Sequence, residues 1–404
     1  MNKTINYTVA NNLCVGCGIC AEMFEETVAK MKIFPDGFLR PQTIRELNYS
    51  ELKLFNNVCP GISVSHLRRD NSFTPTWGPV KEIMTGHAMN DEIRYKGSSG
   101  GIVSALAIHL LETGQVQGVL HIVPSDQNPF ENIAQISRTR EDILRGAGSR
   151  YAPAAPLSRL SECLNQDGVF AFIGKPCDVA ALRSLGRSRV EVEKKFPFLI
   201  AFFCAGTPSL HATKEVVRRM GFDPDEVSKF RYRGNGWPGK ACAETIDGQS
   251  AEMDYDTSWG HILGRDLQFR CKICPDGTGE LADISCADAW NTDEKGYPLF
   301  TETSGRSLVL ARTTAGLQLI KEAEIYKKIF LDADSLANAE KMQPYQVIRK
   351  RTLLARLLGF TLALKLRTRP NYKNLGLFAS AKEVSFIRQL RAIAGSWLRG
   401  LTRG

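Results

Sequence analysis

The chain lacks several features that would place it in a class at once. It has no run of about eighteen apolar residues, which argues against a membrane-spanning helix. Its first residues, Met1 to Tyr7, lack the apolar stretch of a secretory signal. We therefore expect a cytoplasmic protein, in which cysteines stay reduced. The 404 residues are 43% hydrophobic and 24% charged, a balance that excludes disorder and suits two or three domains.

Acidic residues are almost missing from the C-terminal segment. Residues 341–404 hold 14 Lys/Arg and one acid, whereas residues 1–340 hold 38 Lys/Arg and 42 Asp/Glu, so the net charge of +9 comes from this tail. Apolar residues recur at three- and four-residue steps from Phe386 to Leu401, which predicts a basic amphipathic helix. Such a helix can cover its own domain, dock an acidic redox partner or touch the inner membrane face. The tail has no nucleic-acid-binding motif, so we expect no nucleic-acid partner.

The six histidines show no metal-ligand spacing, so the cysteines are the candidate ligands. Cys14, Cys17 and Cys20 form a Cys-x2-Cys-x2-Cys run, and the next cysteine, Cys59, precedes a proline. Thiolates in such equal steps can each bind a different iron of one 4Fe-4S cubane, whereas structural zinc usually takes paired cysteine knuckles. We predict a ferredoxin-type domain over residues 1–70, containing a hairpin that turns at Asp-Gly, residues 36–37.

A motif of small residues follows a predicted linker over residues 71–95. It reads Lys-Gly-Ser-Ser-Gly-Gly from Lys96 to Gly101 and precedes an apolar helix over 102–111. Free backbone N–H groups at such a helix start favour a phosphate, and Ser98 or Ser99 can cap the helix. The motif matches neither the Rossmann nor the Walker pattern. Phosphate binding and an ordinary capped helix start therefore stay equally open.

Three apolar runs predict buried strands of a mostly parallel sheet. They cover residues 118–123, 169–173 and 198–203, and a helical stretch over 179–185 separates the last two. Ligands of such sheets gather at the carboxyl ends of the strands. A ligand site is therefore expected just after residues 173 and 203.

Two cysteines stand at those strand ends. Cys177 and Cys204, together with the later pair Cys271 and Cys274, supply the four thiolates of a second 4Fe-4S cluster. Cys286 is the rival ligand, because it lies only twelve residues past Cys274. Two further cysteines, at positions 163 and 242, fit core positions better than ligand positions.

Six spaced motifs resemble the beta-subunit family of coenzyme F-420 hydrogenase/dehydrogenase, over about residues 10–320. With a fused ferredoxin module, the chain looks most like the bacterial branch often associated with exopolysaccharide genes. The resemblance implies an α/β flavoprotein that binds FAD and iron–sulfur clusters, and some members take a hydride from reduced coenzyme F-420. The motifs are Lys96–Gly101 with Ser104, Gly148–Tyr151, Gly174–Asp178, Cys204–Ser209, Phe230–Trp237 and Cys271–Asp288.

The resemblance also implies which residues contact FAD. The candidates are Lys96, Ser98, Ser99, Gly100, Gly101, Ser104, Gly148, Ser149, Arg150, Tyr151 and Lys175. Arg231 and Arg233 could hold the flavin pyrophosphate or an anionic substrate, or could be plain surface residues of a strand. Asp283 and Asp288 could orient the cluster loop or deliver protons, or could only cap turns.

The predicted fold class is α/β, in the mixed α+β sense. It comprises a ferredoxin-like domain (1–70), a central flavin and iron–sulfur domain (71–340) and a basic helical tail (341–404). The predicted function is an oxidoreductase that relays electrons between two 4Fe-4S clusters and FAD and exchanges a hydride with a small organic substrate or coenzyme F-420. Ferredoxin is a candidate redox partner. The alternative is a non-catalytic, membrane-associated assembly or interaction protein of a polysaccharide gene cluster.

Overall fold

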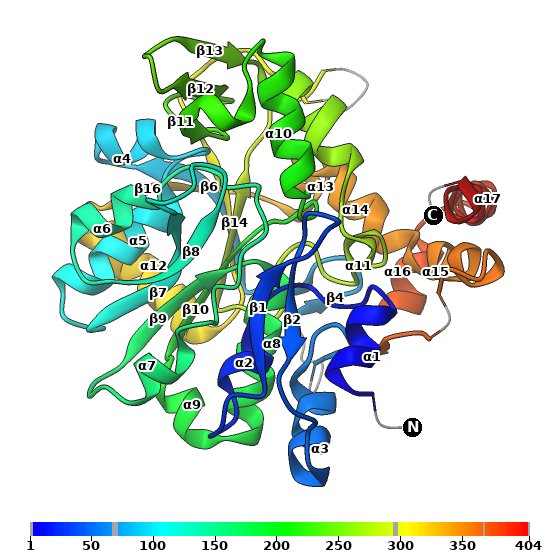
Figure 1. Cartoon of the computed structure of the whole chain (residues 1–404). Coiled ribbons are helices and arrows are strands. Elements are labelled where there is room, and N and C mark those ends of the chain that lie inside the picture. Colours follow the sequence, from blue (N-terminus) through cyan, green and yellow to red (C-terminus); the bar gives the residue numbers. More distant parts are fainter. Residues whose placement is uncertain (1–2, 67–71, 294–297, 367, 403–404) are drawn as a thin grey trace.

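The computed structural model describes residues 3–66, 72–293, 298–366 and 368–402. Its centre is an eight-stranded sheet in the order β16, β6, β15, β14, β10, β9, β7, β8 (Figure 1). This confirms the predicted mixed α/β class. The strands are β6 (Glu82–Ala88), β7 (Gly118–Pro124), β8 (Asn132–Ser137), β9 (Phe170–Gly174), β10 (Phe198–Phe202), β14 (Ile284–Asp288), β15 (Ser307–Ala311) and β16 (Ile329–Ala333).

The sheet is mixed, and the expectation of a mostly parallel sheet is wrong. Strands β7, β9, β10 and β14 run parallel at the centre, and the remaining neighbours pair antiparallel. Apolar runs report burial on both faces and carry no information on strand direction, which is why the prediction failed. The predicted linker over 71–95 is also corrected, because it contains β6, an internal strand of the sheet.

Helices cover both faces of the sheet because successive side chains of a strand point to opposite sides. In β9, Ala171 and Ile173 join the core beneath α5 (Ile102–Glu112) and α12 (Thr314–Ile325). Phe170 and Phe172 join the opposite core, which contains α8 (Pro176–Ser188). A separate three-stranded sheet, β11 (Val227–Arg231), β12 (Ala241–Thr245) and β13 (Ser250–Met253), packs with α10 (Leu210–Arg219).

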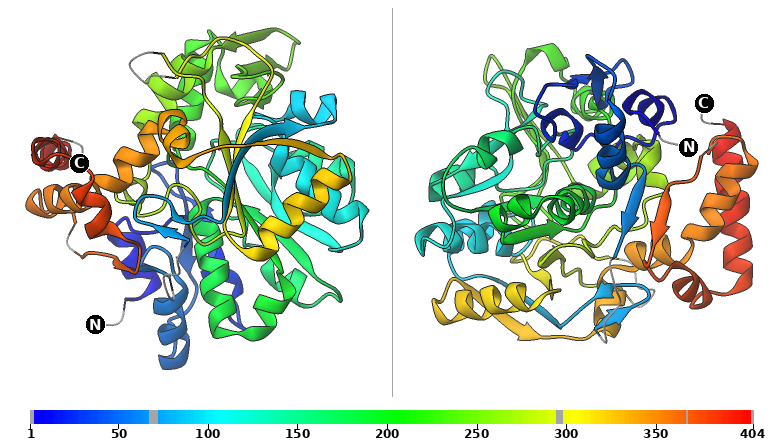
Figure 2. Two further views of the ribbon diagram at one scale, coloured as in Figure 1. Left: turned by 180° about the vertical axis from the view of Figure 1, so that it is seen from behind. Right: turned by 90° about the horizontal axis from the view of Figure 1, so that it is seen from below.

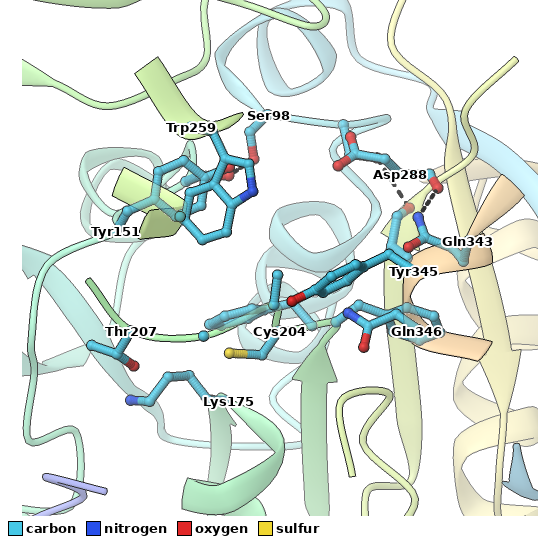
Figure 3. Close-up of a pocket in the computed structure, with 18 of the residues that line it drawn as sticks. Ser98, Tyr151, Lys175, Cys204, Thr207, Trp259, Asp288, Gln343, Tyr345 and Gln346 are labelled. Atoms are coloured by element: carbon cyan, nitrogen blue, oxygen red, sulfur yellow. Dashed lines mark hydrogen bonds between the residues drawn. The ribbon is translucent and has the colours of Figure 1, made fainter. Parts of the chain in front are cut away.

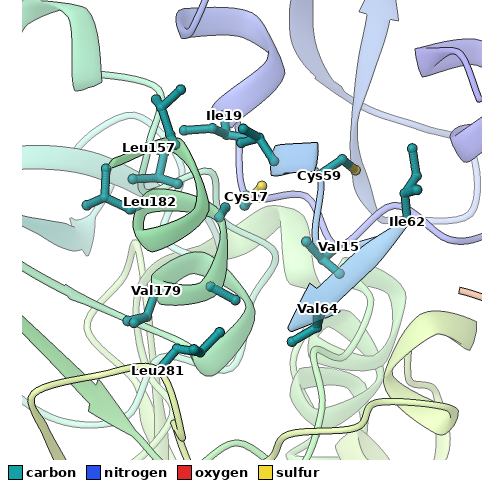
Figure 4. Packing of buried hydrophobic residues seen from close by; sticks show 14 of the residues in the cluster. Val15, Cys17, Ile19, Cys59, Ile62, Val64, Leu157, Val179, Leu182 and Leu281 are labelled. Carbon is teal, nitrogen blue, oxygen red and sulfur yellow. The ribbon is translucent and has the colours of Figure 1, made fainter. Parts of the chain in front are cut away.

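The N-terminal segment packs directly on the core that contains α8. It contains α1 (Ile5–Ala10), α2 (Ile19–Glu22), the hairpin β1 (Ala29–Ile33) and β2 (Leu39–Thr43), α3 (Tyr49–Val58) and β3 (Ser63–Ser65). The hairpin turns through Gly37 at φ +76°, as predicted from Asp-Gly. Figure 4 shows Ile19 and Cys17 near Leu182 of α8, and Val15 and Ile62 belong to the same cluster of buried residues.

The tail is helical and returns to the N-terminal segment. It contains α13 (Leu336–Met342), α14 (Pro344–Arg351), α15 (Leu353–Leu362), β17 (Asn371–Lys373), α16 (Leu377–Lys382) and α17 (Phe386–Thr402), and β17 pairs with β3. One apolar core contains residues of all three predicted segments, and the boundaries at residues 70 and 340 stay predictions. Among the described residues, no helix has the length and apolarity needed to cross a bilayer.

We expect His121 to weaken the fold as the pH falls below 6.5. Burial lowers its pKa to about 4, and its Nε2 atom lies 2.7 Å from the Ser137 hydroxyl. Because the unfolded chain takes up this proton first, stability is lost between pH 6.5 and 4, by about 3 kcal/mol in all. Between pH 7 and 4.5, the stability of His121→Gln in thermal unfolding should therefore fall less steeply than that of the unaltered chain. His261→Gln, at an exposed histidine, is the control, and equal slopes in all three proteins would contradict the prediction.

Candidate functional site

Four cysteines of the N-terminal segment line one small cavity. Cys14 and Cys17 come from the loop that leads into α2, Cys20 lies in α2 itself, and Cys59 immediately follows α3. The loop passes very close to its neighbours at Gly16, where a Cβ atom would lie 2.8 Å from a backbone oxygen. Its φ of +77° also favours glycine there. The fold therefore brings together the four thiols that the spacing predicted.

The surroundings of these thiols fit a group that neutralises several buried sulfurs at once. Burial raises the pKa of Cys17 and of Cys20 well above the ordinary range, and the charges of neighbouring cysteines raise both further. In the described part of the chain, no three His, Cys, Asp or Glu side chains converge on one metal-ion position. A cubane is held through separate irons, so its ligand sulfurs need not converge on one point. The four residues could hold a 4Fe-4S cluster.

The second predicted cysteine set also lies together. Cys177 stands in the first turn of α8, Cys204 just after β10, and Cys271 and Cys274 around the short helix α11 (Phe269–Lys272). Burial raises the Cys204 pKa to about 12, and the charges of Cys271 and Cys274 contribute to the rise. Burial likewise raises the pKa of Cys177, and the charges of Cys204 and Cys274 contribute to the rise. The four thiols could hold a second cluster.

Cys286 is set apart from this group. It lies on β14 with 4% of its surface exposed, and burial is the cause of its raised pKa of about 12. Cys163 is a fully buried core residue, as predicted. Cys242 is half-buried, so its predicted core position is wrong. It occupies the outward side of β12, where alternation places every second residue.

Arg349 of α14 ties the tail to the second cysteine set. Its guanidinium donates hydrogen bonds to the carbonyl oxygens of Cys204 (2.9 Å) and Cys271 (2.7 Å). The neighbouring Lys350 forms a buried ion pair with Glu280, which also lies 3.3 Å from His66. This network joins all three segments of the chain beside the cysteines.

A cavity of about 1680 Å³ opens next to the second cysteine set. Figure 3 shows side chains from strand ends (Lys175, Cys204), from a loop (Tyr151) and from the tail (Tyr345, Gln346) turned toward it. Ten of the thirteen predicted cofactor contacts line this cavity, and Lys96, Gly100 and Arg231 do not. The ten are Ser98, Ser99, Gly101, Ser104, Gly148, Ser149, Arg150, Tyr151, Lys175 and Arg233.

The three residues outside the cavity have other contacts. Lys96 forms an exposed ion pair with Glu92, and Arg231 is half-exposed and lies 3.9 Å from Glu252. At Gly100, a Cβ atom would lie 2.6 Å from the backbone oxygen of Gly86, so this glycine serves a close approach of two backbones.

The helix α5 begins at the cavity wall with a glycine cap. Gly101 is the N-cap at φ +76°, so the prediction that Ser98 or Ser99 caps the helix is wrong. Ser98 instead accepts a hydrogen bond from Ser149 across the cavity wall, and Ser99 bonds to the Arg306 carbonyl. The backbone N–H groups of residues 102–104 have no acceptor among the described residues. They face the cavity at the positive end of the helix dipole.

Arg150 brings an uncompensated charge to the same cavity. Its Nη2 atom is buried and has no hydrogen-bond partner among the described residues, and its Nε atom donates to Asn132. Burial lowers the pKa of this arginine, because the charged form lacks a neutralising carboxylate. A buried guanidinium with one unpartnered nitrogen atom, beside free N–H groups, fits a pyrophosphate.

Arg233 is not a surface residue but a buried one. It forms two hydrogen bonds to the Asp288 carboxylate, at 2.8 and 2.9 Å, and Trp237 donates to the same carboxylate at 2.7 Å. Although burial opposes the charge, Asp288 raises the Arg233 pKa. Asp283 accepts hydrogen bonds from Arg183 and from the Leu199 backbone, which ties strand β10 to the cysteine loop.

Sequence reasoning missed the aromatic and tail residues of the cavity. Tyr255, Trp259 and Trp290 line it, and Arg233 lies over the rings of Tyr255 and Trp290 at 4.5 and 5.1 Å. Tyr345 and Gln346 arrive from α14. Single aromatic residues without spacing carry no signal in a sequence, and the tail was predicted as a basic amphipathic helix without any residue that lines a cavity.

Fold and site together define a mixed α/β protein with a large ligand cavity beside buried thiols. Residues 83–162 match the family model for the coenzyme F420 hydrogenase/dehydrogenase beta subunit N-terminus, and residues 168–335 match the model for its C-terminus. The two matches together span more than half of the chain. The chain therefore belongs to the coenzyme F420 hydrogenase/dehydrogenase beta-subunit family, and it is an oxidoreductase, as the sequence predicted.

The chain is similar to several curated proteins. The chain is 27% identical over 271 residues to the coenzyme F420 hydrogenase subunit beta of Methanococcus voltae, covering 62% of this chain and 92% of that protein. It is 25% identical over 354 residues to the coenzyme F420-dependent sulfite reductase of Methanocaldococcus jannaschii, covering 81% of this chain and 48% of the reductase. The chain thus spans about half the length of that relative.

A solved structure shows the same fold. A chain of the F420-reducing NiFe hydrogenase complex from Methanosarcina barkeri superposes with a TM-score of 0.51 at 23% identity, over 71% of this chain and 96% of that one. Residues 1–82 and 336–404 lie outside both family matches.

Proposed function

We propose that the chain relays electrons between two 4Fe-4S clusters and FAD, and exchanges a hydride with a small organic substrate or a deazaflavin. One observation carries this proposal: the cavity wall and the second cysteine set share Cys204, whose thiol is coupled electrostatically to Cys271 and Cys274. A redox ligand in the cavity would therefore lie beside the cluster. When bound, FAD would supply the exchange between hydride pairs and single electrons.

The residues around the cavity suit FAD in two ways. Arg150 and the free N–H groups at the start of α5 would bind the pyrophosphate. Tyr151 and Trp259, whose rings are 4.5 Å apart, supply an apolar wall for a planar ring. On the floor, Lys175 is held by Asp178 at 2.7 Å and would offer a positive charge to the bound ligand.

The cavity is large enough for a second ligand. Pockets for one drug-sized ligand are usually about 300–1000 Å³, and this one is about 1680 Å³. The relatives named above are F420-dependent enzymes or subunits, so we propose coenzyme F420 or a similar deazaflavin as one occupant. Several relatives are named as subunits, which supports a protein partner such as ferredoxin or a complementary enzyme subunit.

Replacing Arg150 with methionine should weaken FAD binding at least tenfold. A charge-assisted hydrogen bond contributes about 1.5–3 kcal/mol, and methionine keeps most of the apolar volume. Flavin fluorescence released on denaturation, titrated against added FAD, measures the effect. Arg145→Met is the matched control, because Arg145 is exposed and pairs with Asp126. Equal FAD affinity in both variants would remove Arg150 from the site.

The proposed reaction has a direct assay. The cluster-loaded chain with FAD, given reduced coenzyme F420 and a viologen dye, should reduce the dye as the deazaflavin is oxidised. FAD-depleted protein should lose this activity and regain it when FAD is added. If the flavin-loaded chain exchanges electrons with dithionite but not with reduced F420, the proposed relay stands and F420 is excluded as its substrate.

A further inference from the structure

Two tail helices, α15 and α17, lie side by side at the edge of the molecule (Figures 1 and 2). Small residues make their contact. A Cβ atom on Gly359 would lie 2.4 Å from the Ile393 carbonyl oxygen, and one on Gly400 would lie 2.4 Å from the Cβ of Ala363. Ser396 is fully buried between them. Small residues spaced four apart, as in Gly359–Ala363 and Ser396–Gly400, permit the close backbone approach that is typical of helices in lipid.

The large apolar side chains of these helices face away from the contact. We call them the tail patch. It is formed on α17 by Phe386 (75% exposed), Ile387 (63%), Leu390 (48%), Trp397 (43%), Leu398 (53%) and Leu401 (56%), and nearby by Leu358, Leu362, Leu364 and Phe378. If this face of α17 covered its own domain, these residues would be buried. They are exposed, so the own-domain role that the sequence allowed for the helix is wrong for this face. The arrangement exposes apolar surface where a soluble protein would bury it.

The rest of the exposed surface of α17 is basic. At 100° per residue, Arg388, Arg391 and Arg399 lie on one side of the apolar stripe, and all three also line the large cavity. The single acid of the tail, Glu383, is paired with Arg351 at 2.7 Å. The tail patch is therefore bordered by positive charge without neighbouring negative charge from its own segment.

We propose that the tail patch docks this chain on an anionic lipid surface. The apolar stripe of α17 would enter the boundary between headgroups and acyl chains, and the arginines would contact lipid phosphates. A second copy of the chain is a poorer occupant, because it would bring together two tails that each carry 14 Lys/Arg and one acid. The proposal shares Ile387, Arg388, Arg391 and Arg399 with the lining of the large cavity. Leu390 and Leu398 do not line that cavity, so replacing them tests docking separately from the proposed redox site.

The test is sedimentation of the full chain with lipid vesicles. Vesicles of phosphatidylglycerol and phosphatidylcholine should bind the chain at least tenfold more tightly than pure phosphatidylcholine vesicles. A double variant, Leu390→Glu with Leu398→Glu, should lose at least tenfold in affinity, and Ile246→Glu, at an exposed isoleucine outside the patch, should bind normally. Trp397→Phe should still bind but should lose part of the tryptophan blue shift that accompanies binding.

Two results would overturn the proposal. If the unaltered chain ignores anionic vesicles and forms a dimer that the double variant dissociates, the tail patch is an interface between copies. If it ignores the vesicles and stays monomeric, the patch serves a protein partner or none. Circular dichroism of both variants checks that the exposed substitutions leave the fold intact.

Discussion

The Cys17→Ser chain should contain about four irons, half of the roughly eight expected for two cubanes in the unaltered chain. Cys17 shares one small cavity with Cys14, Cys20 and Cys59, and its thiol is buried. A serine oxygen there leaves one corner of the cluster without its thiolate. The second cysteine set lies outside this small cavity and should keep its cluster, although the charge of Asp178, next to Cys177, acts on the Cys17 thiol. Iron and acid-labile sulfide per chain, after anaerobic purification, measure the change.

Cys242→Ser is the matched control for this variant. Cys242 is half-buried on β12 and belongs to neither cysteine set, so its iron content should equal that of the unaltered chain. Full iron in the Cys17→Ser chain would mean that the N-terminal thiols hold no cluster. The ferredoxin assignment of residues 1–70 would then be wrong.

Cys204→Ser should remove the second cluster, whereas Cys286→Ser should leave it in place. Cys204 is half-buried just after β10, and Cys286 is buried on the neighbouring strand β14, where it pairs with Phe202. They differ in electrostatic surroundings: the Cys204 pKa responds to Cys271 and Cys274, and that of Cys286 is raised by burial. The Cys204 variant should therefore hold about four irons and the Cys286 variant about eight.

The Cys204 variant also shows whether electron transfer needs the second cluster when FAD binding is intact. Without the second cluster, the Cys204→Ser chain should still bind FAD but should pass electrons to a viologen dye far more slowly. The reverse iron result, with loss in Cys286→Ser and retention in Cys204→Ser, would reassign the fourth ligand. Retention of the cluster in both variants would remove Cys204 and Cys286 from the ligand set.

Much of the candidate site was predictable because its signals are local. Cysteine spacing depends on chain geometry over a few residues, and the apolar runs before Cys177 and Cys204 place both at strand ends. The hairpin turn at Gly37 follows from the positive φ that glycine adopts without strain. In each case the deciding physics lies within one element or one turn.

What could not be predicted depends on residues far apart in the chain. Gly100 and Gly101 were assigned to a ligand, but close packing against Gly86 and Ile93 explains much of their need for glycine. Strand direction is set by connections between strands, which apolar periodicity does not report. The cavity residues Tyr345 and Gln346 come from a tail that was predicted as a basic amphipathic helix, with no role in a ligand site.

The most direct test of the relay is the composition of the anaerobically purified chain. Iron, acid-labile sulfide and flavin should be quantified per chain, with visible spectra before and after dithionite. The account predicts about eight irons, about eight sulfides and one FAD, with bleaching of both cluster and flavin bands. A chain that binds no flavin and folds equally well without iron would contradict it and would favour a non-catalytic interaction protein.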